Sequence, residues 1–569
     1  MYNDKVADIF LNIARILEIN NANPFRIRAY RNAAHRLKTL TEDISEIAKR
    51  GELEQIPGIG KDLAYKIREY LDTGSIRYYE ELKSKLPGEI LDFLNIPGIG
   101  PRLAETLYYK LNITSINELE KKARNQQLRG VKGIKSKTED NILRGIKLFR
   151  EGRERYPLGY VLPYAEKIRQ QLCEALGSTT ISLAGSIRRR KTTVKDIDIL
   201  VASDDPAKVV DVFLNLVPPA EILAKGSTKT SIITEQGYQI DLRVVSEDSY
   251  GAALCYFTGS KLHNIRIREL ALKKGLKINE YGVYKDGHKI AGATETEVYD
   301  ALGLAYIPPE IREDVGEIEA VLQNQIPTLV KPEDIKGDLH VHSKYSDGTG
   351  TIEEIAAQAR ALGLEWVAVC DHSKSLRIAK GLTEEDLRRK ISDIRSFNDR
   401  SPDIKLLCGT EVDILPDGRL DYPDNILAEL DFVIAAVHSA FKQDRTAMTE
   451  RLVKAARHPL VHSIAHPTGR LFGEREAYDV DIDRIIETCS RHGTALEINA
   501  YPKRLDLDGP SCRLARKKGV RLTIGSDAHL VHQMNYLSLG VAAARRGWLI
   551  ATDVLNTLSY NELRRFLQK

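Results

Sequence analysis

The chain has 569 residues, of which 42% are hydrophobic and 29% charged, so it is too long for one core and should form several globular domains. No apolar run approaches the roughly 20 residues that span a bilayer, and the acids among the first 20 residues are unlike a signal peptide; we expect a cytoplasmic protein with no membrane partner. The six cysteines include no Cys-x-x-Cys pair, which argues against a zinc ribbon or a disulfide framework.

The first 150 residues carry the basic excess of the chain, 27 lysines and arginines against 20 acids. Residues 53–67 and 94–108 repeat one pattern, Pro-Gly-Ile-Gly followed by an amphipathic helix, and residues 128–142 are a degenerate third copy. A Gly-x-Gly turn before a helix exposes backbone N–H groups that suit a phosphate oxygen. A single copy could be an ordinary tight turn, but the repetition resembles DNA-binding helix-hairpin-helix modules. The expected phosphate contacts are Gly58, Gly60, Gly98 and Gly100.

Residues 23–37, "NPFRIRAYRNAAHRL", together with the first hairpin resemble the deoxyribose-phosphate lyase domain of DNA polymerase beta. The resemblance implies a Schiff-base lysine at Lys66, with Tyr30 and Arg26 nearby, and basic neighbours would activate such an amine. Asp62 stands where the lyase pattern has a lysine. Phosphate binding is therefore an equal alternative for Lys66.

Two aspartates, Asp196 and Asp198, alternate with aliphatic residues in a predicted strand, so both carboxylates face one side. Asp241, in a second strand-like run, could join them, and three such aspartates can hold two magnesium or manganese ions. Alone, the pair could be a solvated strand face. Gly185-Ser186 lies ten residues upstream, and Gly-Ser before Asp-x-Asp resembles the polymerase beta-like nucleotidyltransferases.

Residues 256–283 resemble the nucleotide-binding and thumb segment of family X DNA polymerases. The resemblance implies that Tyr256 and Phe257 lie against the sugar of the nucleotide, and that Asn264 and Arg268 reach the minor-groove edge of the new pair. Lys261 replaces an aspartate of the best-known relative. The full set of expected nucleotide-binding residues is Gly185, Ser186, Arg189, Arg155, Tyr256, Phe257, Thr258, Gly259, Asn264 and Arg268.

Ten of the thirteen histidines follow residue 339, and many end strand-like runs that alternate with helices. Seven such strands predict a distorted barrel whose site lies at the carboxyl ends of the strands. A lone histidine in a strand is more often a core residue, but nine ligand-type residues at one rim indicate a metal centre that suits zinc, manganese or iron. They are His340, His342, Asp347, His372, Glu411, His438, His466, Asp527 and His529.

The His-x-His, Asp-His, His-Pro and Ser-Asp-Ala-His motifs of this region resemble the polymerase and histidinol phosphatase (PHP) phosphoesterases. The resemblance implies three transition-metal ions, Mn²⁺ or Zn²⁺, that act on a phosphodiester. The implied sharing gives the first ion His340, His342, Glu411 and Asp527, the second Glu411, His438 and His466, and the third Asp347, His372 and His529.

Together these motifs predict a multidomain α+β and α/β chain, identified as a bacterial family X DNA polymerase with a C-terminal PHP domain. The expected parts are a helical lyase-like domain (1–85), a second hairpin domain (86–153), a palm (154–247), a thumb (248–312), a semi-flexible linker (313–336) and a (β/α)7 barrel (337–569). The predicted enzyme is a monomer that uses dNTPs to fill gapped or nicked DNA in base excision repair or end joining. It carries a 3'-5' exonuclease and an AP lyase or endonuclease, and associates with the nucleoid.

Two alternatives stay open from sequence. The chain could transfer nucleotides to an acceptor other than DNA, although the phosphate hairpins and the Tyr256-Phe257 pair speak against this. It could also be a DNA-bound phosphoesterase whose polymerase half is inactive, in which case Asp196→Ala would change no activity.

Overall fold

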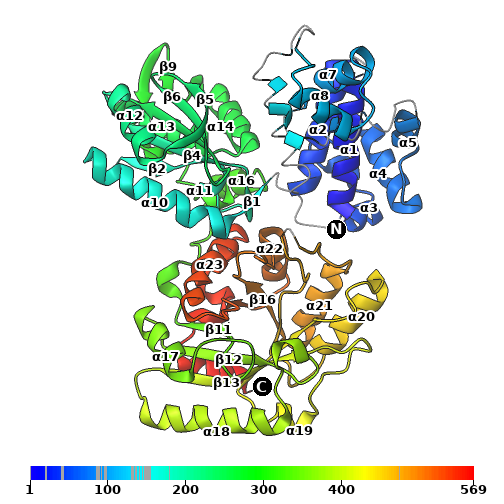
Figure 1. Ribbon diagram of the computed structural model, residues 1–569, viewed down its shortest axis with the longest axis vertical. Helices are drawn as coiled ribbons and strands as arrows, with labels where there is room; N and C mark the ends of the chain where they lie inside the picture. The colour runs from blue at the N-terminus through cyan, green and yellow to red at the C-terminus, as the bar shows by residue number, and fades with distance from the viewer. Residues whose placement is uncertain are drawn as a thin grey trace. The chain divides into compact units, whose positions relative to one another are not determined.

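The computed structural model describes residues 2–568 apart from 20–21, 40–43, 85–89, 91–92, 95, 97–98, 130–133, 135–137, 140, 144, 147–154, 178–179 and 473. The chain divides into two units, Met1–Arg155 and Tyr156–Lys569. Figure 1 shows the first unit in blue to cyan and the second in teal to red.

All regular secondary structure in the described residues of the N-terminal unit is helical. Its elements are α1 (Tyr2–Ile19), α2 (Pro24–Thr39), α3 (Ile44–Lys49), η1 (Leu53–Gln55), α4 (Lys61–Thr73), α5 (Arg77–Ser84), α7 (Pro101–Glu105), the π-helical turn η2 (Thr106–Lys110) and α8 (Ile116–Arg124). Apolar residues recur at helical spacing, so that Phe10, Ile13 and Leu37 are fully buried in one core. Helices α4 and α7 begin directly after Gly60 and Gly100 of the repeated turns.

The second unit begins with a five-stranded mixed sheet of order β2-β4-β7-β6-β5, in which β4 and β7 are parallel neighbours. The elements of this region are β1 (Tyr156–Pro157), α10 (Leu158–Leu176), β2 (Ile181–Leu183), α11 (Gly185–Arg188), β3 (Thr193–Val194), β4 (Asp196–Ala202), α12 (Pro206–Leu216), β5 (Pro219–Lys225), β6 (Lys229–Thr234) and β7 (Gln239–Val245). Because side chains alternate along a strand, Ile197, Ile199 and Val201 of β4 pack into a core with α10 and α12. Leu200, on the same face of β4 as the two aspartates, packs against α13 (Tyr250–Thr258) instead.

A three-stranded antiparallel sheet, β10-β9-β8, follows with its own helices. The elements are η3 (Glu247–Ser249), α13, α14 (Lys261–Lys273), β8 (Leu276–Asn279), β9 (Gly282–Lys285), β10 (His288–Ala291), α15 (Glu295–Ala301), η4 (Pro309–Ile311), α16 (Glu317–Leu322) and η5 (Pro332–Asp334). The segment 313–336, expected as a semi-flexible linker, is packed rather than loose. Ile318 and Val321 of α16 share a core with Tyr299 and Trp548, because the chain places apolar residues among the acids that suggested a linker.

The C-terminal region is a barrel of seven parallel strands in sequential order. Its elements are β11 (Gly337–Val341), α17 (Ile352–Ala361), β12 (Trp366–His372), η6 (Arg377–Ala379), α18 (Glu384–Arg400), β13 (Lys405–Asp413), α19 (Asp424–Leu427), β14 (Phe432–Ala436), α20 (Arg445–Ala456), β15 (Ser463–Ile464), α21 (Ile482–His492), β16 (Ala495–Asn499), α22 (Gly509–Lys517), β17 (Leu522–Gly525), η7 (Val531–Tyr536), α23 (Leu537–Arg546), η8 (Ala551–Asp553), η9 (Leu555–Thr557) and α24 (Tyr560–Leu567). The first strand meets the end of the last, since Asp527 N donates to His340 O at 2.8 Å and His342 N to Ala528 O at 2.9 Å. The predicted (β/α)7 barrel is confirmed.

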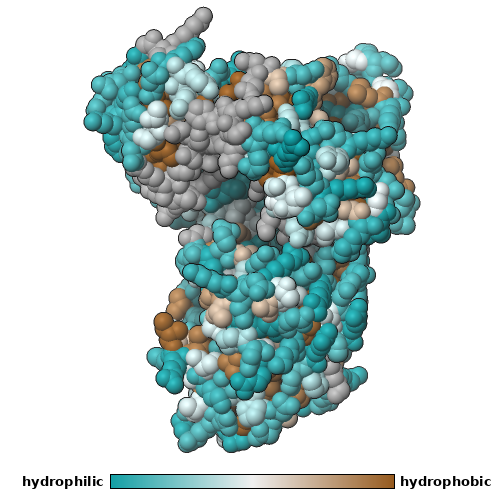
Figure 2. Space-filling model, turned by 90° about the vertical axis from the view of Figure 1, so that its right-hand side faces the viewer, coloured by the Kyte–Doolittle hydropathy of each residue, from teal (hydrophilic) through white to brown (hydrophobic). Residues whose placement is uncertain are grey.

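The molecular face in Figure 2 is mostly hydrophilic, with apolar residues in small separate patches. Within the described ranges, no helix has both the length and the apolar character needed to cross a bilayer.

Candidate metal centres and nucleic-acid interface

The three predicted aspartates of the palm lie together on two neighbouring strands. Strands β4 and β7 run parallel with Asp198 directly beside Asp241, while Asp196 lies beside Gln239. Gln239 Nε2 donates a hydrogen bond to Asp241 Oδ1 at 3.2 Å. The sheet register therefore gathers three carboxylates on one face, as period-two alternation predicts for two of them.

The pKa of the Asp198 carboxyl is shifted strongly by its surroundings. Burial and the negative charges of Asp196 and Asp241 raise the pKa of Asp198 to about 7. Divalent cations bound by these oxygens would remove this mutual repulsion, so the donor set fits magnesium or manganese.

Gly185 brings the backbone of the Gly-Ser turn against these carboxylates. Its φ is +59°, and a Cβ added there would lie 1.9 Å from Asp198 Oδ2. Only glycine fits both the left-handed conformation and the close approach. The turn that should face the phosphates is thus held at the edge of the cation site, and Ser186 follows it in α11.

The arginines after this turn connect the palm to the predicted nucleotide-binding segment. Arg188 donates to Thr258 Oγ1 at 2.7 Å and forms a bidentate pair with Glu295 at 2.8 and 2.6 Å. Arg189 Nε donates to Glu313 Oε1 at 3.0 Å, and its Nη1 donates to the carbonyl of Thr258. Sequence reasoning missed Glu295 and Glu313, since neither belongs to a motif.

The predicted sugar-contacting pair lies just before this junction. The rings of Tyr256 and Phe257 pack edge to face with centroids 5.1 Å apart, and Arg243 of β7 lies 4.1 Å over the Phe257 ring. Asn264 Nδ2 donates to the carbonyl of Tyr256 at 2.7 Å, and Arg268 Nε donates to the carbonyl of Asn264 at 3.2 Å. These contacts tie the segment together; the nucleotide contacts stay predictions.

Gly259 and Arg155 complete the predicted set. Gly259 has a φ of +70°, and a Cβ there would meet Arg189 Nη1 at 3.2 Å. Arg155 is the last residue of the N-terminal unit, and its proposed contact with the triphosphate stays a prediction.

Four of the predicted histidine ligands of the barrel surround one buried carboxylate, that of Glu411 near the end of β13. Glu411 Oε1 lies 2.8 Å from His466 Nε2 and 3.3 Å from His438 Nε2. Its Oε2 lies 2.8 Å from His372 Nδ1 and 3.5 Å from His340 Nε2. Four strands thus direct imidazoles to the two oxygens of one side chain.

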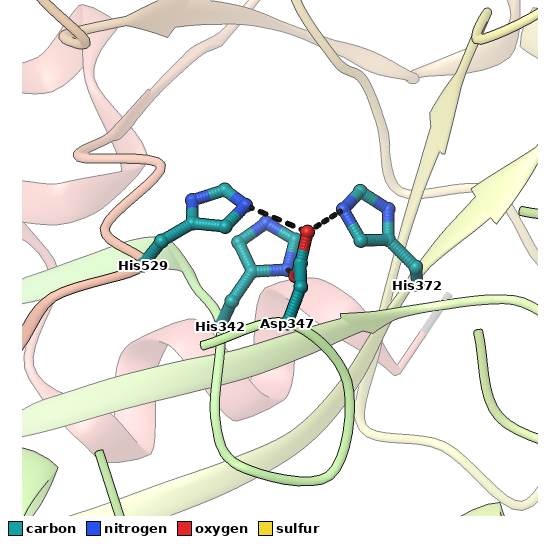
Figure 3. Close-up of side chains that lie close together, drawn as sticks. All are labelled: His342, Asp347, His372 and His529. Atoms are coloured by element: carbon teal, nitrogen blue, oxygen red, sulfur yellow. Dashed lines mark ion pairs between the residues drawn. The ribbon is translucent and has the colours of Figure 1, made fainter. Parts of the chain in front are cut away.

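A second gathering point is Asp347, in the loop after β11. Figure 3 shows His342, His372 and His529 around this carboxylate. Asp347 Oδ2 lies 3.4 Å from His529 Nε2 and 3.6 Å from His372 Nε2, and Oδ1 lies 3.8 Å from His342 Nδ1. Asp527 approaches the opposite ring nitrogen of His342, with Oδ1 3.2 Å from Nε2.

Three sets of donor atoms in the described residues lie close enough to hold a cation. They are His342, Asp347, His372 and His529; His340, His342 and Asp527; and His372, Glu411 and His438. In this grouping His342 and His372 each belong to two sets, whereas the predicted sharing assigned each to one ion and let Glu411 bridge. The assignment of ligands to individual ions stays a prediction.

The barrel donors fit metal ions in their chemistry. Among the described side chains, the buried atoms His342 Nδ1 and His466 Nδ1 have no hydrogen-bond partner. A buried polar atom without a partner is costly, and a cation would satisfy these donors. Imidazole mixed with carboxylate suits transition metals better than magnesium or calcium.

Charge within the cluster is divided between neutral and cationic imidazoles. Burial, reinforced by the neighbouring His529 and His372, lowers the pKa of His342 to about 4. Burial opposes charge on His438 as well, but the Glu411 and Asp413 carboxylates raise its pKa to about 9. Burial opposes the charge of Glu411 too, yet surrounding histidines hold its pKa well below the usual range.

A set of acids behind the ligands was missed by sequence reasoning. His340 Nδ1 lies 2.7 Å from Glu497 Oε1, and His438 Nδ1 lies 2.6 Å from Asp413 Oδ1. Such partners fix the ring orientation and tautomer of a metal-binding histidine. Glu497 lies in the middle of β16, the one barrel strand to which no predicted ligand was assigned, and the missing ligand was the available signal.

The repeated turns of the N-terminal unit expose backbone before a helix. Gly58 has a φ of +86°, Gly60 is the N-cap of α4 and Gly100 the N-cap of α7, and no atom lies within 4 Å of a Cβ added at any of them. Gly98 lies outside the described residues. The open space agrees with the expected approach of a phosphate backbone.

Lys66 is buried on α4 and lies under Tyr78, with Nζ 5.2 Å from the ring centroid. Its Nζ pairs with the carboxylate of Asp62. Arg26 lies 5.0 Å from the same ring, and Tyr30 is buried beside it with its pKa raised by burial and by Asp62. Because the Lys66 amine is bound to the Asp62 carboxylate, this substitution favours charge pairing over amine catalysis.

Comparison with known proteins places these centres in a family. Family models match as a helix-hairpin-helix domain at residues 1–76, a SAM-like helix-hairpin-helix tandem at 90–147, a DNA polymerase beta thumb at 253–313 and a PHP domain at 338–501. The DNA polymerase/3'-5' exonuclease PolX of Bacillus subtilis (strain 168) is 38% identical over 573 residues, covering all of both chains. The chain belongs to the PolX family.

Membership in the PolX family confirms the predicted resemblance to family X polymerases with a PHP domain, and with it the expected enzyme class. The barrel has further relatives: a probable phosphatase of Caldanaerobacter subterraneus subsp. tengcongensis is 27% identical over 243 residues, 41% of this chain and 91% of the relative. A probable phosphatase of Thermoanaerobacter sp. (strain X514) is 26% identical over 243 residues, 41% of this chain and 94% of the relative. The PHP region is thus similar to proteins that consist of little more than this region.

Proposed function

We propose that the protein extends DNA 3' ends with dNTPs at the aspartate centre and removes 3' nucleotides at the barrel centre, filling short gaps in DNA repair. The observation that supports this proposal is that one chain, aligned over its whole length with a PolX polymerase/exonuclease, gathers three aspartates on one sheet face and a cluster of histidines and carboxylates in the barrel.

At the aspartate centre, Asp196, Asp198 and Asp241 would hold two Mg²⁺ or Mn²⁺ ions. Bound there, such ions supply positive charge to the attacking 3'-hydroxyl and to the triphosphate. The protein's own residues position the reactants: the turn at Gly185 and Ser186 offers backbone and hydroxyl donors to the phosphates, with the cationic side chain of Arg189 beside it. The 3'-oxygen forms the new bond to the α-phosphorus, and pyrophosphate leaves.

At the barrel centre, the nine ligands would hold three ions, with Mn²⁺ or Zn²⁺ favoured by the donor types; eight of the nine belong to the three donor sets, and His466 contacts Glu411 Oε1 at 2.8 Å. Bound there, the ions supply Lewis acidity for hydrolysis of a phosphodiester. The chain orients its ligands through Glu497 and Asp413 and excludes water from behind them, since His340 and Glu497 are fully buried. Arg504 Nε lies 3.3 Å from Asp527 Oδ2 and places a cation beside the cluster.

The predicted DNA contacts of Gly58, Gly60, Gly98 and Gly100, the gapped-DNA substrate and the monomeric state belong to this proposal. So do the role in base excision repair and the domain boundaries given above, with 313–336 as a packed segment in place of the expected linker. A repair polymerase acts on chromosomal DNA, from which the predicted cytoplasmic, nucleoid-associated location follows. An AP lyase activity of Lys66 is the weaker part, because Asp62 pairs with its amine.

One gapped substrate with a labelled primer tests both centres. Wild type with dNTPs extends the primer, and without dNTPs it shortens it. Asp198→Ala abolishes extension and leaves shortening intact; His342→Ala does the reverse. If Asp198→Ala still extends the primer, or His342→Ala still shortens it, the assignment of that centre is wrong. Substituting ribonucleotides, or an RNA or protein acceptor, tests the alternative of an acceptor other than DNA.

A further inference from the structure

Helix α23 of the barrel ends on an arginine that reaches into the polymerase region. Arg546 Nη1 donates to the main-chain oxygen of Arg189 at 2.7 Å and to that of Glu310 at 3.4 Å, and lies 3.2 Å from Glu313 Oε1. Figure 1 shows α23 at the end of the barrel that faces α11 and β1. A residue of the phosphoesterase thus contacts the arginine that we assign to the triphosphate.

Glu313 is the centre of this contact. Its Oε1 accepts from Arg189 Nε at 3.0 Å and is the same oxygen that Arg546 approaches, while its Oε2 lies 3.3 Å from Lys191 Nζ. The carboxylate is buried, with 8% of its side chain exposed, and burial alone would raise its pKa. Lys191, Arg546 and Arg189 instead hold its pKa far below the usual range, so it is an anion shared by three cations.

We propose that Arg546 is a positioning residue of the polymerase centre: by sharing Glu313 and binding the main chain of Arg189, it sets how firmly Glu313 holds the Arg189 guanidinium and hence the affinity for a nucleoside triphosphate. This inference rests on the proposed function, in which Arg189 contacts the triphosphate.

Removal of Arg546 should strengthen the ion pair between Glu313 and Arg189, because Glu313 Oε1 then has one guanidinium partner instead of two. With Arg546 present, Oε1 of Glu313 divides its charge between two guanidinium groups. Without Arg546 it pairs with Arg189 alone, in a buried place where ion pairs are strong. Arg189 is then less available to an incoming triphosphate, and its main chain loses a hydrogen bond from Arg546. The three aspartates are unchanged, so nucleotide binding should weaken more than the chemical step.

Arg545 offers a matched control at the same junction. It precedes Arg546 on α23 and donates to Glu310 Oε1 at 2.7 Å and to the Val330 carbonyl at 3.0 Å, contacts that join the barrel to the same segment without using Glu313. If Arg546 only fastened the two regions together, Arg545→Ala would have a comparable effect.

Steady-state single-nucleotide insertion on gapped DNA measures the split between KM for dNTP and kcat in the full chain. We expect Arg546→Ala to raise KM for dNTP about fivefold or more, within the usual range of coupling between sites, with kcat within about twofold. Arg546→Lys, which keeps a cation beside Glu313, should recover most of the loss. Arg545→Ala and the exonuclease activity of Arg546→Ala should resemble wild type.

A double-mutant cycle separates this mechanism from a structural one. In a Glu313→Gln background the shared anion is gone, so Arg546→Ala should change KM by less than about twofold. An Arg546→Ala effect that persists in that background, or that Arg545→Ala reproduces, overturns the proposal. Thermal unfolding of each variant identifies any that fail to fold; if Arg546→Ala does, Arg546→Gln, which removes the charge but keeps much of the side chain, carries the test with the same expected rise in KM.

The Arg189→Ala variant distinguishes an error in the proposed function from an error in the positioning role of Arg546. If Arg189→Ala leaves KM for dNTP unchanged, the assignment of Arg189 to the triphosphate is wrong and this inference is wrong with it. If Arg189→Ala raises KM while Arg546→Ala does not, the proposed function stands and only the positioning role is overturned.

Discussion

The two candidate cation centres differ in how their buried carboxylates are stabilised. In the palm, three carboxylates meet on one sheet face and burial with mutual repulsion raises the pKa of Asp198. In the barrel, the carboxylate of Glu411 is more deeply buried, yet the surrounding imidazoles hold its pKa well below the usual range. An all-acid site needs cations to be stable, whereas an imidazole-rich site partly neutralises itself.

The supports behind the two centres differ as well. Barrel ligands are oriented by acids directly behind them, as Glu497 lies behind His340. In the palm the second layer consists of arginines, and these are held by Glu295 and Glu313 from another part of the chain. The barrel centre is thus built within one fold, while the palm centre depends on packing between regions.

The largest expected effect is the removal of the carboxylate that the barrel centre shares. Glu411→Gln should lower exonuclease activity by about 10³-fold, comparable to removing other essential catalytic groups, because four histidines lose a common anion. Primer extension should not change. Metal content per chain, measured by mass spectrometry, should fall; the exposed Glu385→Gln is the control. Unchanged metal content would contradict the role given to Glu411.

A smaller effect is expected behind the ligands. Glu497→Gln keeps the shape of the side chain but removes the charge that holds His340, so exonuclease activity or metal affinity should fall by about 10- to 100-fold. Added Mn²⁺ should restore much of the activity, measured as a shift in the Mn²⁺ concentration needed for half-maximal rate. A loss that no concentration of metal relieves would mean that Glu497 does not act through metal binding.

Substitution of the hairpin glycines should affect both centres alike, because we propose that these turns bind the DNA on which both centres act. Gly58→Ala, at a φ of +86° with open space around it, should weaken binding to gapped DNA by about fivefold through a displaced turn and blocked N–H groups. Fluorescence anisotropy measures this. Gly74→Ala, at a φ of +74° and the opposite end of the same helix, imposes equal strain away from the turn and should leave affinity near wild type.

The smallest expected effect is on the thermal stability of the metal-free protein, in which the charge of Asp198 is unfavourable and that of Glu411 is favourable. The pKa of Asp198 is about 7 in the folded chain against 3.8 in the unfolded chain. The contribution of this group to the free energy of unfolding is therefore fully present below about pH 4 and is lost as the pH rises through 7. Asp198→Asn should therefore raise the Tm in EDTA at pH 8 by roughly 2 °C and by less at pH 5. Glu411→Gln should lower the Tm under the same conditions. If calorimetry shows that both variants shift the Tm in the same direction, the proposed electrostatic difference between the two centres is wrong.

Much of each site could be predicted from the sequence because its residues are placed by local periodicity. Asp196 and Asp198 share a face since side chains alternate along a strand, and the ligands from His340 to His529 lie at one rim since parallel strands end together. The hairpin turns could be predicted because the Pro-Gly-Ile-Gly pattern before a helix is repeated. These inferences need only a few neighbouring residues each.

Only the tertiary structure decided the contacts that support the sites. Glu497 lies 157 residues from His340, and Arg546 lies 233 residues from Glu313; no local pattern relates such pairs. The segment 313–336 looked like a linker by composition, but its apolar residues are buried against Tyr299 and Trp548. The sequence determined which side chains could bind cations and phosphate; long-range packing decided which charges stand behind them, because burial and pairing depend on neighbours that only the folded chain brings together.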